Sequence, residues 1–142
     1  MLTVSAAQSR KWITSLNTVS LYTCCPKHLR SGDVFRLINY VCHRNDRFIQ
    51  VGGTAILVRR AIEHHAVPVQ GLQHLETTAI QVMLARKPVK ILAAYLSPTR
   101  PLIASDLSAC VGGGLPNLML GDLNAKHVQW NSRLITKRGR LA

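Results

Sequence analysis

Short runs of apolar residues dominate the middle of the chain and predict strands rather than long helices. Thr78, Ile80, Val82 and Leu84 alternate with Ala79, Gln81 and Met83, and another apolar run covers Val89–Tyr95. The segment Ala85-Arg86-Lys87-Pro88 separates the two runs, which predicts a β-hairpin. Gly52-Gly53 opens a third short run, Thr54–Val58, which is rich in aliphatic and β-branched residues and is typical of a central strand.

One segment has the pattern of a helix. Leu102, Ile103, Leu107 and Cys110 share one helical face, and Gly112-Gly113-Gly114 follows as a stop signal. The apolar run Leu115–Leu120 comes next, so the order strand, helix, strand predicts a crossover connection. The predicted fold class is therefore α/β, an α+β sandwich with mixed sheets.

The rest of the chain has weaker patterns. Residues 12–21 have apolar positions loosely spaced for one amphipathic helix. Residues 35–43 are expected to be extended and to close in a turn at residues 44–47. Residues 61–69 are expected to form another strand, and Lys137-Arg138-Gly139-Arg140 a basic tail.

Charge narrows the choice of partner. The chain has 142 residues, enough for one domain, and its 18 Lys and Arg against 6 Asp and Glu give a net charge of +12. Nucleic acid is the first partner to consider and an anionic membrane surface the second. An alternative of roughly equal weight is that the excess of basic residues arose by drift or by truncation that removed acidic parts.

Cysteine spacing and the first residues bear on location. The four cysteines match no zinc pattern, and nothing near residue 1 reads as a signal peptide or a membrane span. We therefore expect an intracellular protein with reduced thiols and no membrane association.

Asp122 and Asn124 are the residues with the strongest chemical signal. Gly121-Asp122-Leu123-Asn124-Ala125 follows an apolar run, and open α/β sheets place their chemistry at strand ends. Two interpretations remain open for Asp122. It caps the next segment by accepting a backbone N–H, or it orients or deprotonates an attacking water while Asn124 donates to a phosphate.

Other candidates carry weaker signals. Tyr95 ends its strand, where a phenol can donate to an oxyanion or simply bridge core and solvent. Glu76 is a candidate acid, more often a solvated salt-bridge partner. His64, His65 and His74 lack metal-ligand spacing. Lys126, His127 and Asn131 follow the motif and are predicted substrate contacts, whereas Trp130 is either a stacking residue or core.

The string from Gly121 to Ala125 resembles the Gly-Asp-Phe-Asn-Ala motif of the endonuclease/exonuclease/phosphatase superfamily. Residues 52–60, 93–98 and 121–132 are similar to the endonuclease domain of insect non-LTR retrotransposons of the jockey type. The resemblance runs from about His28 to Leu141, so residues 28–142 are expected to be part of such a domain, and residues 1–27 stay unassigned.

This resemblance implies a four-layer fold of two mixed sheets flanked by helices. It also implies Mg²⁺ as cofactor, DNA as partner rather than a small molecule, and a nuclear location if chromosomal DNA is the target. By the same resemblance Asp122, Asn124 and Tyr95 are the catalytic residues. No metal ligand and no further cofactor-binding residue is assigned, and the oligomeric state is left open.

The resemblance also identifies departures. Pro26 stands where the family carries a metal-binding glutamate, and the family's first asparagine and final Asp-His pair have no counterpart. Loss of one acid–base group typically lowers a rate by ~10²–10⁴. The expected function is therefore a fragment of a metal-dependent DNA endonuclease with weak or no activity. The alternatives are a non-catalytic nucleic-acid-binding protein and a relic without function.

Overall fold

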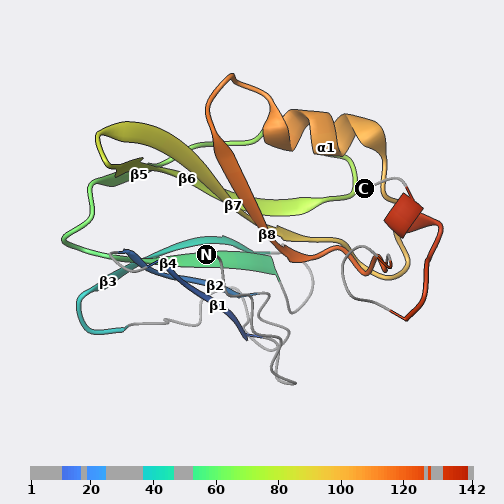
Figure 1. Cartoon of the computed structure of the whole chain (residues 1–142), viewed down its shortest axis with the longest axis horizontal. Helices are drawn as coiled ribbons and strands as arrows, with labels where there is room; N and C mark the ends of the chain where they lie inside the picture. Colours follow the sequence, from blue (N-terminus) through green and yellow to red (C-terminus); the bar gives the residue numbers. More distant parts are fainter. Residues whose placement is uncertain are drawn as a thin grey trace.

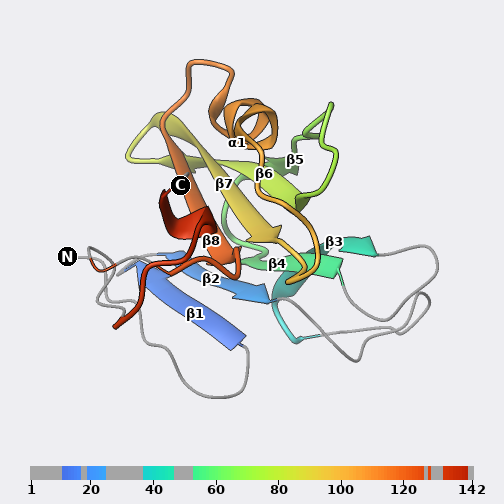
Figure 2. The same cartoon turned by 90° about the vertical axis from the view of Figure 1, so that its right-hand side faces the viewer.

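Two four-stranded sheets face each other, and one helix covers the outer face of the second sheet (Figure 1). The computed structural model describes residues 11–16, 19–24, 37–46, 53–126, 128 and 133–140. The view from the end shows three layers in this part of the chain: the first sheet, the second sheet and the helix (Figure 2).

The first sheet has the strand order β1-β2-β4-β3, and all of its neighbours are antiparallel. Its strands are β1 (Lys11–Leu16), β2 (Val19–Cys24), β3 (Tyr40–Asp46) and β4 (Gly53–Arg59). The helix predicted for residues 12–21 is therefore wrong. Antiparallel pairing of β1 with β2, and of β2 with β4, supplies long-range backbone partners that outweigh a weak helical periodicity.

Strand β3 extends further than its sequence pattern predicts. The turn expected at residues 44–47 is wrong for the part described, because Arg44, Asn45 and Asp46 continue the ladder with Ala55, Thr54 and Gly53. Polar residues suit this strand because it lies at the edge of the sheet.

The second sheet has the order β5-β6-β7-β8. Its strands are β5 (His64–Ala66), β6 (Glu76–Leu84), β7 (Lys87–Tyr95) and β8 (Asn117–Asp122). The predicted hairpin is confirmed as β6 and β7, joined by Ala85 and Arg86, which both have positive φ as in a type I′ turn. The strand predicted for residues 61–69 is only three residues long.

The predicted crossover is also confirmed. Helix α1 (Ala104–Val111) connects β7 to β8, and these two strands are parallel. Asp106 in the first turn of α1 is buried and accepts three backbone N–H bonds, each 2.9 Å long, from Gln73, His74 and Leu75. These bonds hold the loop before β6 against the helix.

Two hydrophobic clusters lie on the two faces of the second sheet. Between the sheets, Ile56 and Val58 of β4 pack against buried residues of β6 and β7: Ile80, Val82, Ile91 and Ala93. On the outer face, Leu92, Ala94 and Leu96 pack with Leu102 and Cys110. The expected α+β sandwich is present, but of the two sheets expected to be mixed only the second is, because all described pairs of the first are antiparallel. No described helix covers the outer face of the first sheet, so the four-layer arrangement stays a prediction.

Candidate functional site at the end of the second sheet

Three polar side chains lie in one row at the same edge of the second sheet, where β6 begins and β7 and β8 end. Glu76 of β6 is the register partner of Tyr95 of β7, and Tyr95 is the partner of Asp122 of β8. Residues two apart on a strand share a face, so Tyr95 lies on the same face as Ala93 of the core between the sheets. The row therefore opens toward the first sheet, at the end of the sandwich that faces the viewer in Figure 2.

Asp122 and Asn124 form a tight turn directly after β8. The backbone N–H of Asn124 donates to Oδ1 of Asp122 at 2.8 Å, and Asn124 has a φ of +49°. This is the capping bond that the sequence left open as one interpretation. Within the described residues this bond engages only Oδ1, and no described group bonds Oδ2 of the half-buried Asp122.

Asn124 connects the loops that follow β8 and β7. Its Nδ2 donates to the carbonyl oxygen of Leu96 at 2.7 Å, while the N–H of Leu96 donates to the carbonyl oxygen of Asp122 at 2.9 Å. Among the described residues, no other group bonds the second Nδ2 proton or Oδ1 of this amide. Asn124 thus holds the residue after Tyr95 close to Asp122.

The close approach of β8 to β7 requires a glycine directly before Asp122. The φ of Gly121 is +154°, and a Cβ at this position would lie 1.7 Å from the carbonyl oxygen of Ala94, its partner on β7. Only a residue without a side chain allows β8 to approach β7 this closely. The approach keeps Asp122 beside Tyr95.

The two sheets are joined by polar contacts near this row, and the sequence analysis missed them. Asn45 of β3 donates from Nδ2 to the carbonyl oxygen of Thr77 at 3.0 Å. The buried Thr78 Oγ1 donates to the carbonyl oxygen of Thr54 at 2.9 Å and lies 2.8 Å from its hydroxyl. No local signal could identify these pairs, because each joins residues more than 20 positions apart.

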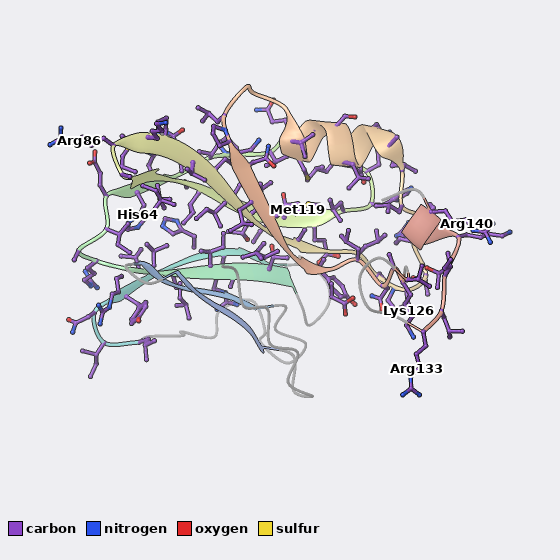
Figure 3. The ribbon with its side chains drawn as sticks, viewed as in Figure 1. His64, Arg86, Met119, Lys126, Arg133 and Arg140 are labelled. Atoms are coloured by element: carbon purple, nitrogen blue, oxygen red, sulfur yellow. The ribbon has the colours of Figure 1, made fainter. Side chains whose placement is uncertain are left out.

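A basic segment lies beyond Asn124. Lys126 is exposed, and its backbone is hydrogen-bonded to Thr136. His127 and Asn131, the other predicted substrate contacts, and Trp130 lie outside the described residues. Figure 3 shows Lys126, Arg133 and Arg140 gathered at this end of the molecule, far from Arg86.

A pair of histidines, His43 and His64, lies apart from this row. His43 of β3 and His64 of β5 meet between the sheets, with ring centroids 5.1 Å apart. Burial, together with the charge of His64, lowers the pKa of His43. Within the described residues, no group of three or more His, Cys, Asp or Glu side chains is placed to hold a metal ion.

Comparison with known proteins gives the origin of the chain. No family model matches it, and no solved structure matches it significantly. It is 27% identical over 136 residues to the RNA-directed DNA polymerase from mobile element jockey of Drosophila funebris, and 29% identical over 94 residues to the probable RNA-directed DNA polymerase from transposon BS of Drosophila melanogaster. The chain is homologous to these proteins of jockey-like mobile elements.

The jockey-like similarity has two further features. It covers 89% of this chain, a larger share than residues 28–142 make up, so it extends into the N-terminal segment that the sequence pattern set apart. The chain spans only 14% of the jockey protein and 10% of the BS protein, so it corresponds to a small part of each. None of the described helices is long and apolar enough to cross a membrane.

Proposed function

We propose that this jockey-like chain is part of a retrotransposon DNA endonuclease that hydrolyses phosphodiester bonds with Mg²⁺. The observation that carries the proposal is the register pairing of Tyr95 with Asp122 at the ends of two parallel strands, with Asn124 bonded back to Leu96. Three groups that suit phosphodiester chemistry thereby meet at one sheet end.

Each group has a defined task in this proposal. Asp122 accepts a proton from the attacking water or orients it through Oδ2, because Oδ1 is engaged by the turn. Asn124 donates its remaining amide proton to a phosphate oxygen without adding negative charge. The phenol of Tyr95 donates to another phosphate oxygen as charge develops there.

The carboxylates on this face fit a minimal magnesium site. Mg²⁺ is often held by one or two carboxylates, with water and substrate phosphate completing its coordination. Asp122 and Glu76 are the two carboxylates in the described row; Glu76 would hold the ion, while Oδ2 of Asp122 serves the attacking water. Bound Mg²⁺ would stabilise charge on the phosphate and lower the pKa of a coordinated water.

In this proposal the nicking activity is weak. Pro26, where the resembled family has a glutamate, cannot coordinate a metal. Within residues 1–142 the family's final Asp-His pair also has no counterpart. Each missing acid–base group typically reduces a rate by ~10²–10⁴, so nicking is expected to be slow.

Nicking of supercoiled plasmid by the purified chain tests the proposal, with Mg²⁺ and with EDTA. Asp122→Asn keeps an oxygen for the N–H of Asn124 but removes the negative charge, whereas Asp122→Ala removes both. We expect slow Mg²⁺-dependent nicking that both variants abolish. Nicking that persists in Asp122→Asn would refute the role of Asp122.

A second candidate function is sequence-independent nucleic-acid binding without catalysis. The net charge of +12 favours it. No Mg²⁺-dependent nicking, combined with DNA affinity that falls steeply with salt, would select this function over the endonuclease.

A further inference from the structure

The segment after the candidate site is entirely basic in its charge. From Leu123 to Ala142 the sequence has no Asp or Glu and contains five cationic side chains: Lys126, Arg133, Lys137, Arg138 and Arg140. Such a segment repels itself unless something holds it in place. The structure supplies that restraint for the basic arm, which we define as residues 133–140.

Thr136 fastens the basic arm to the loop after Asn124. Its N–H donates to the carbonyl oxygen of Lys126 at 2.9 Å, and its Oγ1 accepts from the N–H of Lys126 at 3.0 Å. The same Oγ1 accepts from the N–H of Gly139 at 3.2 Å. The half-buried Thr136 is therefore hydrogen-bonded to both the N–H and the carbonyl oxygen of Lys126, and its bond to Gly139 closes the turn at residues 136–139.

Gly139 brings the arm into close contact with the same residue. It is buried, and a Cβ there would lie 1.9 Å from the carbonyl oxygen of Lys126. The short 3-10 helix that contains it, η2 (Arg138–Arg140), thus packs directly on the backbone two residues after Asn124.

The cations of the arm remain exposed despite this close packing. Arg133, Lys137 and Arg140 are exposed, as is Lys126. In Figure 3 the labelled side chains of Arg133 and Arg140 extend away from the body of the molecule, at the end where β8 stops. These cations therefore project from a segment whose backbone is bonded to Lys126, two residues after Asn124.

We propose that the basic arm, held by Thr136, forms an interaction surface for the phosphate backbone of duplex DNA beside the candidate site. This inference rests on the proposed function for the choice of DNA. Thr136 is a positioning residue: it contacts no substrate but sets where three cations lie relative to Asp122 and Asn124.

Binding of a short DNA duplex, measured by fluorescence anisotropy between about 50 and 200 mM salt, tests this surface. Replacing Arg133, Lys137 and Arg140 together by Gln should reduce the slope of log affinity against log salt by about 3. A matched control replaces Arg59, Arg60 and Arg86, three exposed arginines, by Gln and should reduce it less. Equal reductions would show that only total charge matters and would overturn the proposal.

Substitution of Thr136 separates positioning from charge. Thr136→Val keeps the shape but loses Oγ1, and we expect lower affinity and a smaller salt slope although no charge has changed. Thr136→Ser should restore wild-type binding, and Thr99→Val, at an exposed threonine, should have no effect. Affinity unchanged in Thr136→Val would overturn the role of Thr136.

Wild-type results distinguish the two proposals. Absence of DNA binding by the wild-type chain would overturn both the basic surface and the endonuclease. Nicking by the wild-type chain with binding insensitive to the arm would overturn the surface alone. Tighter binding of an RNA duplex of the same sequence, with the same dependence on Thr136, would overturn DNA as the partner.

Discussion

Gly121→Ala should disrupt the candidate site without changing any polar group. The new Cβ would lie 1.7 Å from the carbonyl oxygen of Ala94, whereas ordinary contacts begin at 3.4 Å. The alanine would also occupy a φ of +154°, which side chains rarely adopt. Strands β7 and β8 must therefore separate by more than ~1 Å.

This separation is large enough to break the local ladder. The bond from Leu96 N–H to the carbonyl oxygen of Asp122 is 2.9 Å long and would exceed hydrogen-bond distance. Two or three ladder bonds at about 0.5–1.5 kcal/mol each, with the strained φ, predict a loss of about 3–5 kcal/mol. Tyr95 and Asp122 would also lose their alignment.

Denaturant unfolding and hydrogen exchange at the Leu96 amide measure the effect. Gly114→Ala is a matched control, because Gly114 has a φ of +70° but nothing within 4 Å of a new Cβ. It should cost only the backbone strain, about 1–2 kcal/mol. A loss in Gly121→Ala no larger than that in Gly114→Ala, with unchanged exchange at Leu96, would refute the close-approach argument.

Three further predictions concern other buried polar groups. Asp106→Asn should destabilise the fold by about 2–4 kcal/mol in denaturant unfolding, because an amide cannot accept all three N–H bonds. Since these N–H bonds outweigh burial and lower the pKa of Asp106, the difference should shrink as pH falls below about 4. Burial and the charge of His64 lower the pKa of His43, so as pH falls the unfolded chain takes up this proton at a higher pH than the folded chain does. The free energy of unfolding should therefore fall as pH drops below about 6.5. His43→Gln should make the free energy of unfolding less dependent on pH in this range. Thr78→Val should cost about 1–3 kcal/mol in thermal unfolding, because Thr54 loses its partner.

Each of these predictions has a contrary outcome. If the free energy of unfolding lost in Asp106→Asn were the same at neutral and acid pH, the negative charge of Asp106 would not contribute to holding the loop. A pH profile unchanged in His43→Gln would assign the acid sensitivity to another group. Thr78→Val with stability equal to that of the exposed control Thr99→Val would show that the link between the sheets contributes nothing.

Local patterns predicted the parts of the fold that depend on neighbours in sequence. The β6–β7 hairpin was identified because its two apolar runs are separated by only a few residues. The crossover through α1 to β8 followed from a helical face ended by three glycines. Asp122 and Tyr95 were recognised as candidates because each ends a strand, although their catalytic roles stay predictions.

Tertiary pairing decided what the local patterns could not. Strand β2 forms because it pairs with β4, β1 forms because it pairs with β2, and the short β5 exists only where β6 pairs with it. Asn45 was predicted to lie in a turn, yet it crosses to Thr77 of the facing sheet. Such contacts carry no signal in a window of neighbouring residues, since their free energy comes from distant groups.

The sequence by itself determined the chemistry available: a carboxylate and an amide after a glycine, a tyrosine at a strand end, and an excess of positive charge. Only the tertiary structure decided that Tyr95 and Asp122 are register partners and that Thr136 holds the basic arm beside Asn124. The physical reason is that side-chain identity is a local property. Register and docking instead follow from strand pairing and packing between residues far apart in the chain.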